Sequence, residues 1–145
     1  MKRIHIGLSV ADVPASVAFY SRLFGAEPTL VKADYAKWQL EDPRVNFSIS
    51  KRCETPGDFH LGIQVETPAE LADISDRLRR AGEELVAEGP ATCCYHRSDK
   101  AWVFDPQEIR WETFLTHGEA AIYGEDSLTP SLKDDSAEDA ESCCR

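Results

Sequence analysis

The sequence predicts an α+β fold in which two βαβββ modules enclose one shared metal cavity. A segment that begins at His5 (HIGLSV) returns 55 residues later at His60 (HLGIQV). Each copy then continues into a helical pattern followed by a glycine, Gly25 or Gly82. An Asp-Pro turn comes later in both copies. Three similarities in the same order indicate an internal repeat.

The first copy shows each predicted element in order. Residues 3–10 alternate between apolar and polar side chains, which is typical of a half-buried strand. Apolar residues at helical spacing predict a helix over 13–24, with Asp12 as its N-cap and Gly25 as its stop. Three short strands follow near 28–32, 35–40 and 45–50, with Asp42-Pro43 as the turn between the last two.

The second copy repeats this order with an insertion. A strand over 59–66 leads into a helix over 68–81, for which Thr67 is the N-cap and Pro68 the first residue. About eight extra residues then precede its Asp-Pro turn, and they include Cys93 and Cys94, which we expect in a loop. The remaining strands are predicted near 85–87, 100–104 and 108–115.

Length and charge indicate one folded domain followed by an acidic tail. Its 145 residues suffice for one domain, which we place at residues 1–117, with modules at about 1–52 and 57–117. Residues 118–145 carry eight acidic and two basic residues and few large apolar ones. We expect them to form an acidic, disordered tail that ends in Cys143-Cys144-Arg145.

The composition excludes several classes of partner. A net charge of -10 argues against nucleic acid and against an anionic membrane surface. No apolar run approaches the roughly 20 residues that cross a bilayer, and the first residues lack the apolar core of a signal peptide. We therefore expect a cytoplasmic protein, monomeric or homodimeric, whose five cysteines are thiols.

Strand parity brings three potential metal ligands together. In the first strand Ile4, Ile6 and Leu8 take the face packed on the helix, so His5 takes the opposite face. The same alternation places His60 and Glu112 on the matching face of their strands. Two histidines and one carboxylate are typical of non-haem Fe(II) oxygenases, although Zn, Ni, Co and Mn also suit them.

The repeat also indicates that the metal site is open. The position equivalent to Glu112 in the first copy is Ser48, and a serine is a poor ligand. Three protein ligands leave positions for water, O₂ or substrate, as in catalytic rather than structural sites.

These motifs resemble a known superfamily. The segments at His5, at Phe19-Tyr20-Ser21-Arg22-Leu23-Phe24-Gly25, at His60 and at Trp111-Glu112 are similar to the glyoxalase/bleomycin-resistance/extradiol-dioxygenase proteins, whose fold is called the vicinal-oxygen-chelate fold. Cys93-Cys94-Tyr95, Asn46-Phe47 and the opening stretch resemble one branch, the ArsI/CadI family. The similarity covers roughly residues 1–117.

The resemblance implies an enzyme that uses Fe(II) and O₂ to cleave the carbon–arsenic bond of trivalent organoarsenicals, releasing arsenite. The family's metal ligands fall on His5, His60 and Glu112, and its arsenical-binding pair falls on Cys93 and Cys94. Thiolates suit a soft arsenic centre. A disulfide between two adjacent cysteines would close a strained ring, so the pair is expected to remain as two free thiols.

Three other functions remain open at this stage. The chain could bind cadmium or arsenic without turnover, using the same cysteines. It could be another dioxygenase or isomerase of the superfamily, with incidental cysteines. A drug-sequestering protein would need no metal.

Overall fold

The element order is βαβββ twice, as the repeat predicted. The first module consists of β1 (Arg3–Ser9), α1 (Val13–Phe24), β2 (Leu30–Lys32), β3 (Tyr35–Glu41) and β4 (Arg44–Ser50). The second consists of β5 (Phe59–Val65), α2 (Pro68–Arg80), β6 (Val86–Cys93), β7 (His96–Phe104) and β8 (Arg110–Glu119). The computed structural model describes residues 1–51, 55–93 and 96–119, with the backbone alone for 87–97, 118 and 119.

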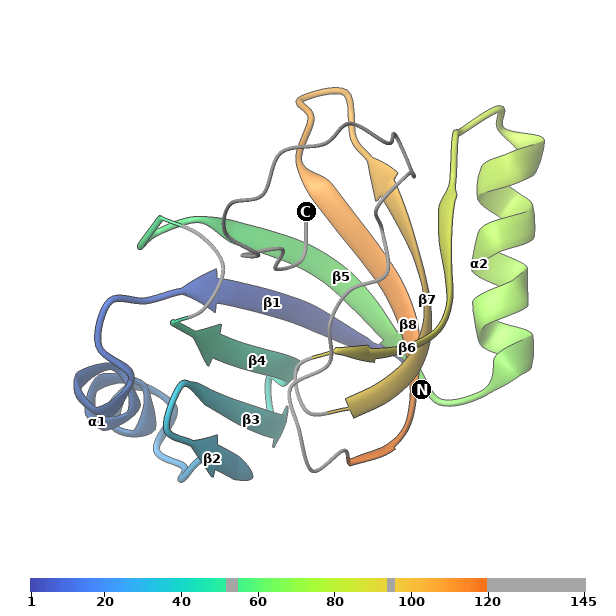
Figure 1. Ribbon diagram of the computed structural model, residues 1–145. Helices are drawn as coiled ribbons and strands as arrows, with labels where there is room; N and C mark the ends of the chain where they lie inside the picture. The colour runs from blue at the N-terminus through green and yellow to red at the C-terminus, as the bar shows by residue number, and fades with distance from the viewer. Residues whose placement is uncertain (52–54, 94–95, 120–145) are drawn as a thin grey trace, which may run out of the picture.

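All eight strands form one curved sheet in the order β2-β3-β4-β1-β5-β8-β7-β6. The modules meet where β1 pairs antiparallel with β5. On either side of this seam the repeat is visible in the pairing, because β1–β4 and β5–β8 are both parallel. Figure 1 shows α1 beside one half of the sheet and α2 beside the other. The opposite face of the sheet is therefore shared by the two modules.

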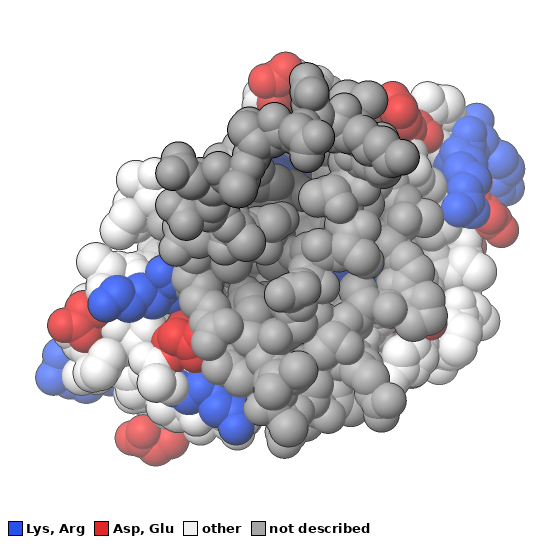
Figure 2. Space-filling model, viewed as in Figure 1, with Lys and Arg blue, Asp and Glu red and all other residues white. Residues whose placement is uncertain are grey.

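The residues that flank each helix explain its limits. The Asp12 carboxylate accepts a hydrogen bond from the Ala15 amide at 2.9 Å, and Gly25 adopts the left-handed conformation with φ 63°. Thr67 caps α2 in the same way, 3.2 Å from the Glu70 amide. Figure 2 shows basic side chains gathered near the end of α2. The last turn of α2 carries Arg77, Arg79 and Arg80, whose positive charges interact favourably with the negative end of the helix dipole.

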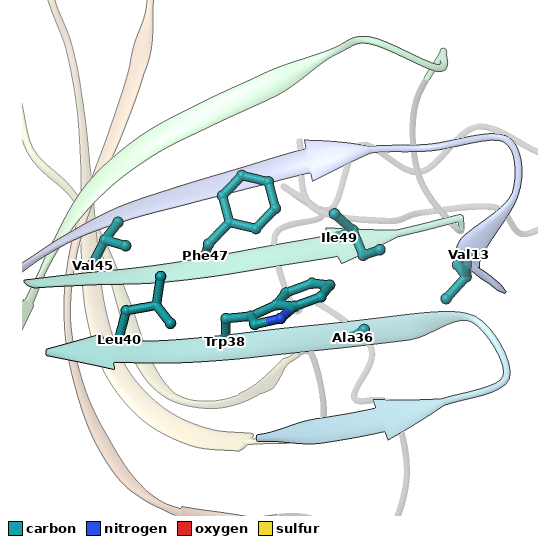
Figure 3. Close-up of a cluster of buried hydrophobic side chains, with 7 residues drawn as sticks. All are labelled: Val13, Ala36, Trp38, Leu40, Val45, Phe47 and Ile49. Atoms are coloured by element: carbon teal, nitrogen blue, oxygen red, sulfur yellow. The ribbon is translucent and has the colours of Figure 1, made fainter. Parts of the chain in front are cut away.

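The larger hydrophobic core lies in the first module, between α1 and the strands β3 and β4. Trp38 is completely buried at its centre, and its indole N–H donates to the Ala26 carbonyl at 3.1 Å. Figure 3 shows the buried cluster, which consists of Val13, Ala36, Trp38, Leu40, Val45, Phe47 and Ile49. Against α2 the buried cluster is smaller and contains Val65, Ile74 and Leu115. Of the described helices, neither is long and apolar enough to span a membrane.

One expectation about the strands was wrong. The insertion in the second copy is not a long loop, because it extends β6 to Cys93 and begins β7 at His96. The two strands pair as a hairpin, with a shift of register between Glu88 and Ala91. Ile4 pairs with Val45 of the core cluster and so shares the packed face with Ile6 and Leu8, as expected, although the residue is 49% exposed.

Candidate metal centre

Three strands contribute one side chain each to a single cluster near the module seam. His5 of β1 and Glu112 of β8 both lie opposite Gly62 of β5 in the strand register. His60 of β5 lies opposite Gly7 of β1. Directly paired residues point to the same face of a sheet, so the three side chains share the face turned away from the helices.

The donor atoms of these side chains are close enough to bind one metal ion. His5 Nε2 lies 3.2 Å from His60 Nε2 and 3.1 Å from a Glu112 carboxylate oxygen. The distance from His60 Nε2 to the same oxygen is 3.4 Å. His5 and Glu112 are buried, and His60 is partly exposed. The structure therefore brings together the three residues that strand parity selected.

Hydrogen bonding prepares His5 for metal binding. Its Nδ1 lies 3.1 Å from the backbone carbonyl oxygen of Asn46. Because a carbonyl oxygen only accepts, Nδ1 carries the proton and donates it. When a metal ion binds, the neutral imidazole would therefore offer the lone pair of Nε2, the atom that faces His60 and Glu112.

The cluster also stabilises the charged form of Glu112. Burial raises the pKa of this carboxyl, because it disfavours a charge away from water. Hydrogen bonds from His5 and His60, together with their charges, outweigh burial and hold the pKa of Glu112 well below its usual range. Glu112 is therefore a carboxylate at neutral pH, the form that binds metal ions.

Two glycines leave the space that the ligands occupy. A β-carbon on Gly7 would overlap the His60 imidazole. A β-carbon on Gly62 would lie 2.6 Å from the Glu112 carbonyl oxygen and 2.7 Å from its Cγ atom. The spacing His-x-Gly in both copies thus has a steric cause: each glycine makes room for the ligand on the strand opposite.

Replacing Gly62 with alanine is expected to lower the affinity for divalent metal by about 10- to 100-fold, the range typical of altered support for a ligand. The new methyl group would displace Glu112, and the nearest atom, a backbone oxygen, cannot rotate away. Metal titration under nitrogen measures the change. Ser50→Ala, a small substitution on β4, is the control, and equal affinities in both variants would contradict the steric explanation.

Aromatic and basic side chains border the cluster. The Phe114 ring lies edge-on to His5, with ring centroids 5.2 Å apart, and Trp102 lies edge-on to His60 at 5.6 Å. The amine of Lys100, which is buried, lies 5.4 Å from the centre of the Trp102 ring. The two imidazoles are thus held between apolar rings, which fix their orientation.

The pairing supports the comparison of Ser48 with Glu112. Ser48 pairs with Gly7, just as Glu112 pairs with Gly62. Ser48 is buried, but its short side chain bears no carboxylate or imidazole. The first module therefore contributes only His5 to the three-residue cluster.

The predicted arsenical-binding cysteines are only partly described. Cys93 is the last residue of β6, where its backbone pairs with His96, while Cys94 lies outside the described residues. Cys53 and the Cys143-Cys144 pair also lie outside them. Their predicted roles stay predictions.

Sequence reasoning missed several neighbours of the site. The alternation that selects His60 and Glu112 also puts Gln64 and Phe114 on the ligand face, but it assigns them no part. Gln39 and Trp102 required the register of neighbouring strands. In the structure Gln39 pairs with Asn46 next to His5, and Trp102 pairs with Glu112.

Comparison with known proteins identifies similar sequences along nearly the whole chain. The family model of the Glyoxalase/Bleomycin resistance protein/Dioxygenase superfamily matches residues 2–113. A trivalent organoarsenical cleaving enzyme of Bacillus sp. (strain MD1) is 40% identical, over 99% of this chain and 91% of that protein. The cadmium-induced protein CadI of Mycobacterium bovis is 34% identical, over 99% of this chain and 93% of that protein.

Solved structures agree in fold. An extradiol ring-cleaving dioxygenase from B. fuscum matches 81% of this chain with a TM-score of 0.60 and 16% identity. A Mn(II)-bound glyoxalase from Novosphingobium aromaticivorans matches 83% with a TM-score of 0.57 and 18% identity. The match covers 33% of the first of these proteins and 42% of the second. At such identities the likeness concerns the fold alone.

Proposed function

The chain belongs to the glyoxalase/bleomycin resistance protein/dioxygenase superfamily, in the branch of the trivalent organoarsenical cleaving enzymes and CadI proteins, and we propose that it cleaves the carbon–arsenic bond of trivalent organoarsenicals. The products would be inorganic arsenite and the oxidised carbon group. Small methyl or aryl arsenicals are the substrates that this activity implies.

The observation that carries this proposal is the identity of 40% with an organoarsenical cleaving enzyme over 99% of this chain. The cluster of His5, His60 and Glu112 supplies a place for the chemistry, because its donor atoms lie within 3.4 Å of one another. Sequence likeness thus supports the reaction, and the site geometry supports a metal ion as its cofactor.

We propose that His5, His60 and Glu112 hold Fe(II). Two neutral imidazoles and a carboxylate are the ligand set of many non-haem iron oxygenases. Ni, Co, Zn and Mn would fit the same donors. Bound Fe(II) would supply the activation of O₂, the co-substrate. Ser48 would add no strong fourth ligand, so positions on the ion would stay open to small molecules.

The remaining residues would bind and orient the substrate. Cys93 and Cys94 are proposed to replace the two exchangeable oxygens of the arsenical, which leaves the carbon–arsenic bond intact until it reaches the metal. Phe114 and Trp102 offer apolar surface beside the two imidazoles, where a methyl or aryl group avoids water. Holding both partners in place lowers the entropic barrier to reaction.

The test is a reconstitution under nitrogen. Purified protein is loaded with Fe(II) and mixed with methylarsenite, and O₂ is then admitted. The arsenic species are separated and quantified. Arsenite is expected only when both Fe(II) and O₂ are present. Samples without metal or without O₂ are the controls. Arsenite formation in the absence of metal would contradict the proposed role of the cluster.

Sequestration without turnover is the second candidate, because the chain is also 34% identical to a cadmium-induced protein. This candidate predicts tight binding of cadmium or methylarsenite and no arsenite in the reconstitution. The same experiment therefore separates the two functions.

The organisation of the chain completes the proposal. We propose that residues 1–117 form the catalytic domain, that the acidic segment 118–145 is a tail outside it, and that the protein acts in the cytoplasm as a monomer or homodimer. Its partner is the small arsenical, with no role for nucleic acid or membranes.

A further inference from the structure

Three amide side chains lie together on the ligand face, on the first-module side of the metal centre. We name Gln39, Asn46 and Gln64 the amide cluster. Gln39 of β3 pairs with Asn46 of β4, and Asn46 pairs with His5, so these side chains share one face. Gln64 of β5 reaches them from across the module seam. The cluster directly adjoins a metal ligand.

Hydrogen bonds determine how the three side-chain amides are oriented. The Gln64 side-chain oxygen accepts from Gln39 Nε2 at 2.9 Å and from Asn46 Nδ2 at 3.2 Å. Gln64 Nε2 in turn lies 3.5 Å from the Thr116 hydroxyl oxygen. Both amide nitrogens are therefore turned toward Gln64, and the carbonyl oxygens of Gln39 and Asn46 are turned away from it.

These two oxygens have no hydrogen-bond partner among the described residues, although both are buried. The Asn46 residue is only 4% exposed. Buried carbonyl oxygens are nearly always paired, because an unpaired one loses its bonds to water without replacement. An unpaired acceptor beside a metal site is therefore a place where a ligand with an O–H or N–H group is stabilised.

We propose that the amide cluster is a subsite that accepts hydrogen bonds from hydroxyl groups on trivalent arsenic. This inference rests on the proposed function for the identity of the ligand. Free trivalent arsenicals carry hydroxyl groups on arsenic, and inorganic arsenite carries three. Amide oxygens are hard, neutral acceptors, so they recognise the hydroxyl hydrogens, whereas thiolates recognise the arsenic itself.

The subsite gives the cavity a second means of recognition. A hydroxyl on the substrate before capture by cysteine, or on arsenic after the carbon group has left, can bond to Asn46 and Gln39. Because Asn46 also holds His5 through its backbone carbonyl, the hydroxylated arsenic would lie beside the metal ligand. The cluster therefore favours arsenite over a fully carbon- or sulfur-substituted arsenic.

The test is titration of full-length, reduced protein with inorganic arsenite under nitrogen, followed by calorimetry, with and without Fe(II). Asn46→Leu is expected to weaken arsenite binding about tenfold, because it removes one hydrogen bond to a buried acceptor. Asn46→Asp keeps an acceptor oxygen but loses the N–H that Asn46 donates to Gln64, so its arsenite affinity is expected to fall less than that of Asn46→Leu. Gln107→Leu, an amide substitution at an exposed turn, is the matched control.

The cysteines are the same in all variants, so the differences isolate the amide contribution. Equal arsenite affinity in wild type, Asn46→Leu and Gln107→Leu would overturn the subsite. If the wild type never releases arsenite from methylarsenite but Asn46→Leu still weakens arsenite binding, the proposed lyase activity fails and the subsite stands. If Asn46→Leu and Asn46→Asp lose arsenite binding equally, with the same loss of thermal stability, the network is structural and the subsite is wrong.

Discussion

Glu112→Ala is expected to lower metal affinity by more than about a hundredfold and to abolish arsenite release. Substitutions of residues that merely support a ligand already cost 10- to 100-fold. Glu112 is the only acid in the three-residue cluster, and its carboxylate contacts both imidazoles. Without it, two histidines alone would have to hold a divalent cation in a buried site, with no negative charge to compensate.

Metal content after dialysis and arsenic speciation measure the two effects separately. Glu108→Ala, which removes an exposed acid from the turn before β8, is the matched control and should change neither. Glu112→Ala protein that retains iron and produces arsenite at the wild-type rate would show that the cluster is not the metal site.

Replacing Cys93 and Cys94 with serine is expected to reduce kcat/KM for methylarsenite on the order of a hundredfold or more. Tethering replaces a chance encounter with a fixed geometry, and misplacing a reactant by about 1 Å can already cost that much. A serine hydroxyl cannot substitute, because oxygen ligands bind a soft centre weakly. Metal affinity should remain unchanged, since neither cysteine belongs to the cluster of His5, His60 and Glu112.

Cys53→Ser is the control for loss of a thiol outside the pair. Kinetics under saturating O₂ provide the comparison. Full turnover by the double variant would mean that arsenicals reach the metal without thiol capture, and would remove the mechanistic reason for the cysteine pair.

The parts of the fold with strong local signals were predictable. The helix over 13–24 was predicted with the limits it has, because Asp12 and Gly25 mark its ends chemically. The predicted strand at 35–40 differs from β3 by a single residue. Alternating polarity and turn residues are properties of neighbouring positions, so a single sequence reveals them.

The β6–β7 hairpin was not predictable in this way. Its arm contains Glu88, Gly89 and Pro90, which are typical of a loop, and the strand register shifts between Glu88 and Ala91. β6 pairs with β7, β7 with β8, and β8 with β5, so the hairpin is held in a sheet that includes a strand from a distant part of the chain. Local sequence reasoning has no access to that contribution.

The same distinction between local and long-range signals applies to the site. The identity of the metal-binding cluster followed from the repeat and from strand parity, since both are periodic properties of the sequence. The amide cluster and Trp102 did not, because they adjoin the ligands only through the lateral order of strands β3, β4, β7 and β8.

The position of the cluster across the module seam affects how the protein would unfold. β1 and β5 hold the two halves of the sheet together, and the ligands come from both halves. An ion bound there would link the two halves of the sheet, and its bonds to the ligands would have to break before the halves separate. At a hundredfold excess over its dissociation constant it would add about 2.7 kcal/mol to the free energy of unfolding. Amide hydrogens of β1 and β5 should therefore exchange more slowly with solvent deuterium when metal is present.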